Sequence, residues 1–306
     1  MRKHLLVAAL AGLAALPTAF QTSAAPVEKA GKIRVLLIDG QNNHDWRATT
    51  PLLKKELEET GRFTVAVSSN LKQGDKPGLV ETVPFPPAVY PEYDVVVSNY
   101  NGAPWPGEFQ KELEKVLGDG KIGLVIVHAA NNSFSGWGEY NRMIGMGWRD
   151  NKFGDRLIVD DAGKEVRVAK GQGPGAGHGP RHPFTITIRD SEHPITKGMP
   201  REWLHNVDEL YHGMRGPAEN VHLLATALDE KAQKGTGEHE PMIWTVAYGK
   251  GRVFHTPMGH DVEAMRCTGF AATLQRGTEW AATGKVTLPL PADFPTAAKT
   301  STRPAK

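Results

Sequence analysis

Three histidines each follow the end of an apolar, β-branched segment, which is the first indication of a functional site. The histidines and the segments before them are, in chain order, His44 after 33–38, His128 after 123–127, and His260 after 253–256. The carboxyl ends of parallel strands share one edge of a sheet, where ligands bind. We therefore expect the three imidazoles to meet, and imidazoles can transfer protons or bind metal ions. The alternative for each is a loop histidine that hydrogen-bonds to the backbone.

The segment 208–212, Asp-Glu-Leu-Tyr-His, concentrates further chemically active groups. Neighbouring residues of an extended chain point in opposite directions, so one carboxylate is expected to reach the histidines, and we assign this role to Glu209. The alternative is a solvated acidic turn. The predicted catalytic residues are His44, His128, Glu209, Tyr211 and His260. The predicted substrate-binding residues are Asn99, Tyr100, Asn131, Trp137, Asp208, His212 and Trp244.

One divalent metal ion is the cofactor that these residue types could bind, with His128, Glu209 and His260 as predicted ligands. A second candidate pair is His178 and His182, spaced like ligands on one face of a helix. Gly179 and Pro180 lie between them, so the pair could converge only as loop ligands. The glycine-rich loop 171–179 lacks the Lys-Ser/Thr pair of a phosphate-binding loop, and no nucleotide cofactor is expected.

Alternating strand and helix patterns must position these side chains. Strands are predicted at 33–38, 63–68, 93–98 and 123–127. Two helices are predicted between them, one beginning at Thr50–Pro51 and the other at Pro106–Gly107, and each ends at a glycine. This alternation is typical of a doubly wound, mostly parallel α/β sheet. Between 156 and 256 the pattern changes to short strands and hairpins, which predicts an inserted β-rich portion.

The C-terminal part is predicted as one helix over 262–282, followed by a tail. Cys267 lies on the apolar stripe of that helix, with no strand-to-turn context typical of a nucleophile, so we interpret it as a core residue. We expect one domain over 32–284 and a disordered, proline- and alanine-rich tail over 285–306.

Trp137, Trp148 and Trp244 could each stack on a sugar ring, with a buried core position as the alternative.

Residues 1–25 have the charged start, apolar middle and small-residue end of a secretory signal peptide. The alternative is a retained membrane anchor. We therefore expect a periplasmic or secreted protein, cut after Ala24 or Ala25 and free of the membrane.

The net charge of +2 is spread evenly along the sequence, which excludes a nucleic-acid-binding surface. The single cysteine excludes an intrachain disulfide. The sequence leaves the oligomeric state open.

Several segments together resemble the ThuA-like (trehalose-utilisation) family of the class I glutamine amidotransferase-like superfamily. They are IDGQNNHDW, VVVSNYNG, GLVIVHAA, WGEYNRMIG, HPITKGM, DELYH and PMIWTVAYGKGRVFHTPMGH, spread over 32–282. The resemblance implies a flavodoxin-like fold and points to His44, His128, Asp208, Glu209, Tyr211 and His260. The chain departs from the family at Asn99, where an acidic residue is frequent, and around 146–182.

The resemblance, together with the predicted signal peptide, implies an exported carbohydrate-active enzyme that cleaves or processes a glycoside or its 3-keto derivative. Glu209 or His128 would be the base and His260 the acid, with Tyr211 or a metal ion stabilising an enolate. Glutaminase activity is not implied, because no cysteine follows the strand that ends before His128. Two alternatives stay open: a non-catalytic carbohydrate-binding or accessory protein, and a metal-dependent amide or ester hydrolase.

Overall fold

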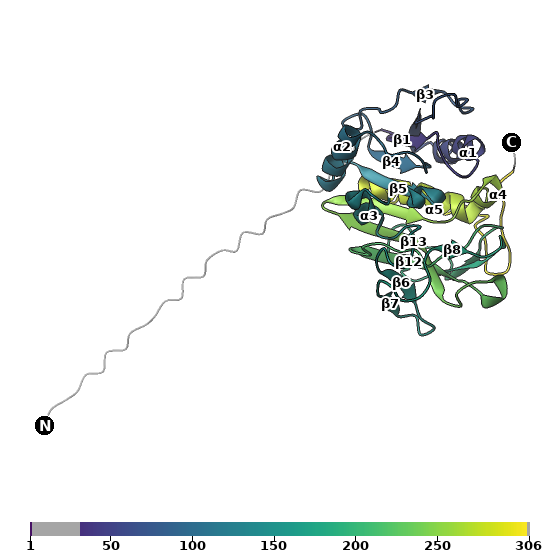
Figure 1. Ribbon diagram of the computed structural model, residues 1–306. Helices are drawn as coiled ribbons and strands as arrows, with labels where there is room; N and C mark the ends of the chain where they lie inside the picture. The colour runs from purple at the N-terminus through teal and green to yellow at the C-terminus, as the bar shows by residue number, and fades with distance from the viewer. Residues whose placement is uncertain (2–30, 305–306) are drawn as a thin grey trace. The chain divides into compact units, whose positions relative to one another are not determined.

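The computed structural model describes Met1 and residues 31–304. The predicted signal peptide and its cleavage site therefore lie, apart from Met1, outside the described residues. Among the described residues, no helix has the length and apolarity needed to cross a bilayer. The helices and strands all belong to one compact unit, Lys32–Lys306 (Figure 1).

Half of the main sheet is parallel, and it carries the site. Its strands are β1 (Ile33–Asp39), β2 (Phe63–Ser69), β3 (Thr82–Val83), β4 (Val95–Ser98), β5 (Gly123–Val127) and β14 (Gly251–Thr256). They pair in the order β14-β5-β4-β1-β2-β3. The chain leaves β1 for β2 on one side and returns to β4 on the other. The strand order thus reverses beside β1, the place where open α/β sheets bind ligands.

An antiparallel portion extends this sheet beyond β14, as the hairpin patterns predicted. The strands are β13 (His239–Tyr248), β12 (Val221–Leu228), β9 (Thr185–Ile188) and β10 (Glu202–Leu204), with β6 (Arg156–Val159) and β7 (Glu165–Val168) branching from β13. The described part of the sheet has twelve strands. Two more strands, β8 (Gly177–His178) and β11 (Tyr211–His212), form a separate antiparallel pair. That pair connects the glycine-rich loop to the DELYH segment.

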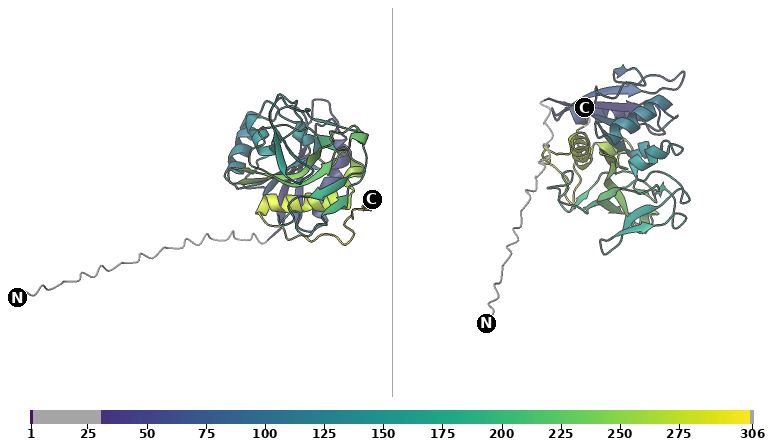
Figure 2. Two further views of the ribbon diagram at one scale, coloured as in Figure 1. Left: turned by 90° about the horizontal axis from the view of Figure 1, so that it is seen from below. Right: turned by 90° about the vertical axis from the view of Figure 1, so that its left-hand side faces the viewer.

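Helices cover both faces of the parallel half. They are α1 (Trp46–Glu58), α2 (Gly107–Gly118), α3 (Gly138–Ile144), α4 (Val262–Met265) and α5 (Thr268–Thr283), together with the 3₁₀ turns η1 (His128–Asn132) and η2 (Lys231–Gln233). Figure 2 shows α5, in yellow, on the opposite face of the sheet from the teal helices. Because strand side chains alternate, Val35 packs in the core under α1 and α5, and Leu36 packs in the core under α2 and α3.

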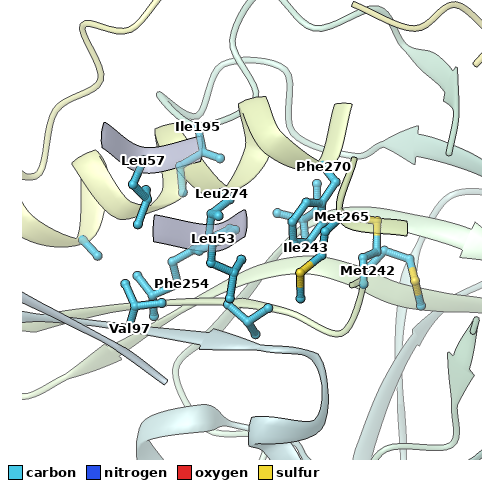
Figure 3. Close-up of a cluster of buried hydrophobic side chains, with 14 of the residues drawn as sticks. Leu53, Leu57, Val97, Ile195, Met242, Ile243, Phe254, Met265, Phe270 and Leu274 are labelled. Atoms are coloured by element: carbon cyan, nitrogen blue, oxygen red, sulfur yellow. The ribbon is translucent and has the colours of Figure 1, made fainter. Parts of the chain in front are cut away.

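The core under α1 and α5 fixes the strand ends that carry the site. Leu53 of α1 and Leu274 of α5 meet above Phe254 of β14 and Val97 of β4 (Figure 3). All four are fully buried. Burial of side chains of this size stabilises the fold by roughly 1.5–3 kcal/mol each. The carboxyl edge of the parallel strands therefore lies beside a fully buried apolar layer.

Two helix boundaries differ from the predicted ones. The first helix begins at Trp46, because the Asp45 side chain caps it by accepting a hydrogen bond from the Ala48 N–H at 3.2 Å, and Pro51 lies inside the helix. The predicted start at Thr50 was therefore wrong. The predicted single helix over 262–282 is two helices, α4 and α5, and Cys267 is the buried N-cap residue of α5.

The predicted disorder of the tail was also wrong for residues 285–304. Leu290 and Phe294 pack on the core, and the Phe294 ring lies 5.5 Å from that of Trp203. The Thr268 N–H donates to the Ser301 carbonyl at 2.9 Å, which attaches the tail to α5. The composition of the tail suggested disorder, but its few apolar side chains are spaced to reach the core. Residues 305–306 lie outside the described part.

Candidate functional site

The structure brings the three strand-end histidines together at the carboxyl edge of the parallel strands. The ring centroids of His44 and His128 are 4.6 Å apart, those of His44 and His260 4.7 Å, and those of His128 and His260 5.7 Å. His44 lies in the loop between β1 and α1, His128 begins η1 directly after β5, and His260 lies between β14 and α4. We call these residues, with Glu209 and Tyr211, the histidine cluster.

Glu209 lies at the centre of the histidine cluster. One carboxylate oxygen, Oε1, is 3.1 Å from His260 Nε2 and 3.5 Å from His178 Nε2. The other oxygen, Oε2, is 3.6 Å from His128 Nε2 and 3.9 Å from His44 Nε2. The glutamate is 8% exposed, so little water screens these interactions. Of the two neighbouring carboxylates, Glu209 is the one that faces the histidines.

The backbone fixes His128 in one orientation and one tautomer. Its φ of 46° is rare for a residue with a side chain, and such strain persists only where the surroundings enforce it. The Nδ1–H donates to the Pro257 carbonyl at 2.6 Å, so Nε2 carries a lone pair when the ring is neutral. The Tyr211 hydroxyl lies 3.0 Å from that Nε2 and donates to it. His128 is thus a proton acceptor aimed into the cluster.

His44 has the same tautomer. Its Nδ1 lies 3.3 Å from Asn42 Oδ1, which also accepts from the His44 backbone N–H. The Asn42 side-chain amide is oriented by a second bond, because its Nδ2 donates to the Asn99 carbonyl at 3.2 Å. Nδ1 of His44 is therefore the donor, and its Nε2 presents a lone pair to the cluster. Neither Asn42 nor this role of the Asn99 backbone was predicted from the sequence.

The charges in the cluster are unevenly distributed. Burial lowers the pKa of His128 to about 4, which keeps this ring neutral. Burial opposes ionisation of Glu209, but the hydrogen bond from His260 and the charge interactions with the neighbouring rings outweigh it and lower the pKa of this carboxyl. The hydrogen bond to Glu209 raises the pKa of His260. Burial raises the pKa of Tyr211, so its hydroxyl stays protonated. Negative charge thus resides on Glu209, and the compensating positive charge lies beside it.

Asp208 faces away from the cluster and fixes the backbone of the residues that form it. The carboxylate is fully buried and accepts hydrogen bonds from the backbone N–H groups of Gly259, His260 and Glu209, at 2.7, 3.0 and 2.8 Å. It also lies 2.8 Å from Nε2 of His205. Burial disfavours charge on His205, but Cys267 and Asp208 raise the pKa of this ring to about 9. Asp208 was predicted to bind substrate, and the structure makes it a positioning residue instead.

The β8–β11 pair brings the glycine-rich loop to the cluster. Residue by residue, His178 pairs with Tyr211 and Gly177 with His212. A Cβ on Gly177 would lie 2.6 Å from His212 Nε2, so this close approach requires glycine. The loop therefore serves close packing, and it places His178 within reach of Glu209. His182 does not join, because its Nδ1 is hydrogen-bonded to the Pro180 carbonyl at 2.8 Å and its ring lies beside Phe184.

Several predicted substrate-binding side chains do not line the cluster. Trp244 is fully buried and donates to the Ile144 carbonyl, and Trp137 donates to Glu114. His212 pairs with Asp229 at 2.7 Å. Long-range partners, which no local pattern specifies, bind the polar groups of these three side chains. Three more predicted substrate-binding side chains form hydrogen bonds inside the protein. Asn131 bonds to His255, the Asn99 amide to Thr49 and Thr50, and the Tyr100 hydroxyl to the Ala103 carbonyl.

Two clefts are lined by residues next to members of the cluster. One, of about 420 Å³, is lined by Trp148, Arg149, Asp150, Asn151, Gly175 and Ala176. Trp148 is half-buried and lies 4.6 Å from the Tyr211 ring and 5.8 Å from the His178 ring, measured between centroids. The other, of about 400 Å³, is lined by residues on both sides of His44, including Asn42, Asn43 and Arg47. Of the three tryptophans considered for sugar stacking, Trp148 alone lies beside the cluster.

Comparison with known proteins agrees with this architecture. A sequence profile of the family described as ThuA, trehalose utilisation, matches residues 34–281. A ThuA-like protein from Parabacteroides merdae shares 42% identity and a TM-score of 0.80, with 89% of this chain and 98% of that chain covered. A ThuA-like protein from Bacteroides uniformis has the same fold, with 17% identity, a TM-score of 0.55, and 87% and 97% of the two chains covered. No curated protein matches the chain.

The profile match spans all three strand-end histidines together with Glu209 and Tyr211. The sequence resemblance and the doubly wound α/β fold, related to the glutamine amidotransferase-like class, are both confirmed. The chain belongs to the ThuA (trehalose utilisation) family.

Proposed function

We propose that this protein is an exported enzyme of glycoside or disaccharide breakdown, and that its substrate is a glycoside carrying a ketone at C3. The observation that carries the proposal is the tautomer of His128, which aims a lone pair on Nε2 into a cluster that also holds a phenol and a carboxylate. A neutral imidazole beside hydrogen-bond donors is suited to removing a proton next to a carbonyl group. Membership of a trehalose-utilisation family supports a sugar as the substrate.

The proposed reaction begins with the acidic hydrogen at C2, next to the C3 ketone. His128 Nε2 accepts this proton, and the electrons move to the ketone oxygen as an enolate. The Tyr211 hydroxyl, 3.0 Å from Nε2 in the resting state, then donates a hydrogen bond to the enolate, and the positive charge beside Glu209 stabilises it. Return of the electrons expels the C1 oxygen substituent, which receives the proton from His128. Addition of water to the resulting C1–C2 double bond completes the cleavage.

The clefts beside the cluster favour a substrate with two rings. Trp148 offers an aromatic face next to Tyr211, and Asp150 and Asn151 offer hydrogen-bonding groups in the same cleft. An aromatic wall with a few polar groups is typical of sites that bind sugars. The second cleft, beside His44, is rich in amide side chains. We expect the two clefts to accept the two rings of a disaccharide substrate.

His128→Ala tests the proposal. We expect the wild-type protein to release product from 3-keto-trehalose. The kcat of the variant should be lower by about 10²–10⁴-fold, the usual contribution of a general base. Product is measured by chromatography. The matched control is His222→Ala, a surface histidine paired with Asp190, and it should keep the wild-type rate. Binding of the sugar by calorimetry with no product from the keto or the parent sugar would overturn the enzymatic proposal in favour of a carbohydrate-binding protein.

A further inference from the structure

We propose that His44, Glu209 and His260 bind one divalent transition-metal ion, with zinc as the ion that best matches the ligand types. Two imidazoles and one carboxylate, on three separate segments, are a ligand set found in catalytic zinc sites. The proposal depends only on the geometry of the cluster and is independent of the sugar chemistry. It differs from the set predicted from the sequence, in which His128 stood in place of His44.

The spacing of the donor atoms is the first argument. One ligand atom from each of the three residues lies within 4.8 Å of the other two. His260 Nε2 is 3.1 Å from Glu209 Oε1, and His44 Nε2 is 3.9 Å from Glu209 Oε2. Ligands at about 2.0–2.2 Å from zinc lie at most about 4.4 Å apart. Small rotations of these side chains would therefore bring all three donors to bonding distance.

The tautomers give the second, independent argument. His44 uses its Nδ1–H on Asn42 Oδ1, so its Nε2 presents a lone pair toward Nε2 of His128, 3.4 Å away, which already accepts from Tyr211. The nearest oxygen of Glu209 is also an acceptor. His178 repeats the pattern, since its Nδ1 donates to the Gly179 carbonyl at 2.7 Å and its Nε2 faces Glu209 Oε1. Acceptors that converge on acceptors repel one another unless a cation lies among them.

The groups around the ligands match those of known metal sites. A metal-bound histidine usually donates its other N–H to a carbonyl or a carboxylate, which fixes the ring. Asn42 does this for His44; Nδ1 of His260 has no hydrogen-bond partner among the described residues, and the nearby Asp261 Oδ2, 3.5 Å away, is the acceptor within reach of it. Asp208 holds the backbone of both Glu209 and His260. The three ligands are therefore positioned before any ion arrives.

Tyr211 explains why His128 stays outside the ligand set. Its hydroxyl donates to the one nitrogen of His128 that could bind a metal, at 3.0 Å. His128 thereby remains a base beside the ion. An ion held by the three ligands would supply positive charge beside His128, and the roles proposed for His128 and Tyr211 would be unchanged.

Metal titration tests the inference without any sugar. The full mature chain is stripped with a chelator and titrated with Zn²⁺ by calorimetry and with Co²⁺ by visible absorption. We expect one equivalent per chain. Glu209→Gln and His44→Ala should each weaken binding by at least about 10–100-fold, since even groups behind the ligands have effects of this size. His128→Ala and the surface control His222→Ala should bind within a few-fold of wild type.

Three results of the metal titration would decide against the proposed site or its ligands. Absence of saturable binding at one equivalent, or equal binding by all variants, would overturn the proposal. So would weak binding by His128→Ala with intact binding by His44→Ala, because that result restores the other ligand set. Circular dichroism checks that each variant folds. If His44→Ala does not fold, His44→Asn is used in its place. A protein that binds zinc as expected but cleaves no keto sugar would retain the metal site and lose the proposed function.

Discussion

At the scale of single residues, hydrogen bonds to the far side of each ring decide what the cluster can do. Pro257 and Asn42 take the Nδ1 protons of His128 and His44, and this leaves Nε2 of both rings as acceptors. Tyr211 is the only predicted catalytic residue whose proton points at His128 in the described structure. Its hydroxyl therefore has two roles: it satisfies a buried lone pair at rest and is available to an oxygen of the substrate during reaction.

Tyr211→Phe separates these roles from packing. The ring is retained and the hydroxyl is lost, so we expect kcat on a 3-keto-glycoside to fall roughly 10²–10³-fold, as for other lost donors to a developing oxyanion. The free energy of unfolding should fall by about 1–2 kcal/mol, because a buried lone pair loses its donor. The control is Tyr100→Phe, which also removes a buried hydroxyl, bonded to the Ala103 carbonyl. It should lose stability alone. Equal rates for both variants would exclude a role for the Tyr211 hydroxyl in catalysis.

At the scale of elements, α1 contributes both a wall of the core and an unusual buried acid. Glu56 is 1% exposed, and neither carboxylate oxygen has a hydrogen-bond partner among residues 31–304. Burial raises the pKa of Glu56 to about 8, an effect that Arg303 and Lys55 reduce and Cys267 increases. The gap between this pKa and the ordinary value of 4.5 makes the stability of the fold depend on pH.

Glu56→Gln should remove this dependence. Between pH 4.5 and about 8 the folded chain keeps a proton on Glu56 that the unfolded chain has released. The contribution of Glu56 to the free energy of unfolding therefore falls as the pH rises through this window, by up to about 1.4 kcal/mol per unit. We expect the variant to be more stable than wild type at pH 8, and the difference to shrink at pH 5. Urea denaturation at both pH values measures it, with Glu108→Gln, at an exposed position of α2, as control. Parallel pH curves for wild type and Glu56→Gln would contradict the assignment.

At the scale of the whole described unit, the C-terminal segment ties distant elements together. The Thr296 carbonyl accepts from the Leu204 N–H of β10, and the Arg303 N–H donates to the Arg266 carbonyl before α5. Phe294 packs on Trp203. These contacts join the antiparallel portion of the sheet to the helices under the parallel portion, and α4 directly follows His260. The tail therefore supports the segment that carries the third histidine.

Removing residues 292–306 should destabilise the fold. Loss of Phe294 and its neighbours exposes apolar surface of the core, and we expect a decrease of roughly 2–4 kcal/mol in the free energy of unfolding. Denaturation by urea, followed by tryptophan fluorescence, measures the change. The control is Lys299→Ala, an exposed tail residue whose backbone contacts are kept. A truncated chain as stable as wild type would mean that the tail contacts contribute nothing.

The sequence by itself determined the parallel half of the sheet and the residues at its carboxyl edge. Continuous β-branched runs predict buried strands, and helices between them force a parallel order, so 33–38, 93–98 and 123–127 were found almost at their observed bounds. Strands in this order end at one edge. His44, His128 and His260 follow from that geometry, since each lies only a few residues past a strand end.

The tertiary structure alone decided what depends on partners far away in the chain. It buries Trp244 and turns Asp208 behind the cluster, and it pairs His178 with Tyr211 through β8 and β11. It also orders the tail and assigns the donor nitrogen of each ring. Local patterns cannot specify these features, because the partner atoms belong to segments tens of residues away. The sequence thus located the site, and only long-range contacts determined which atoms face one another within it.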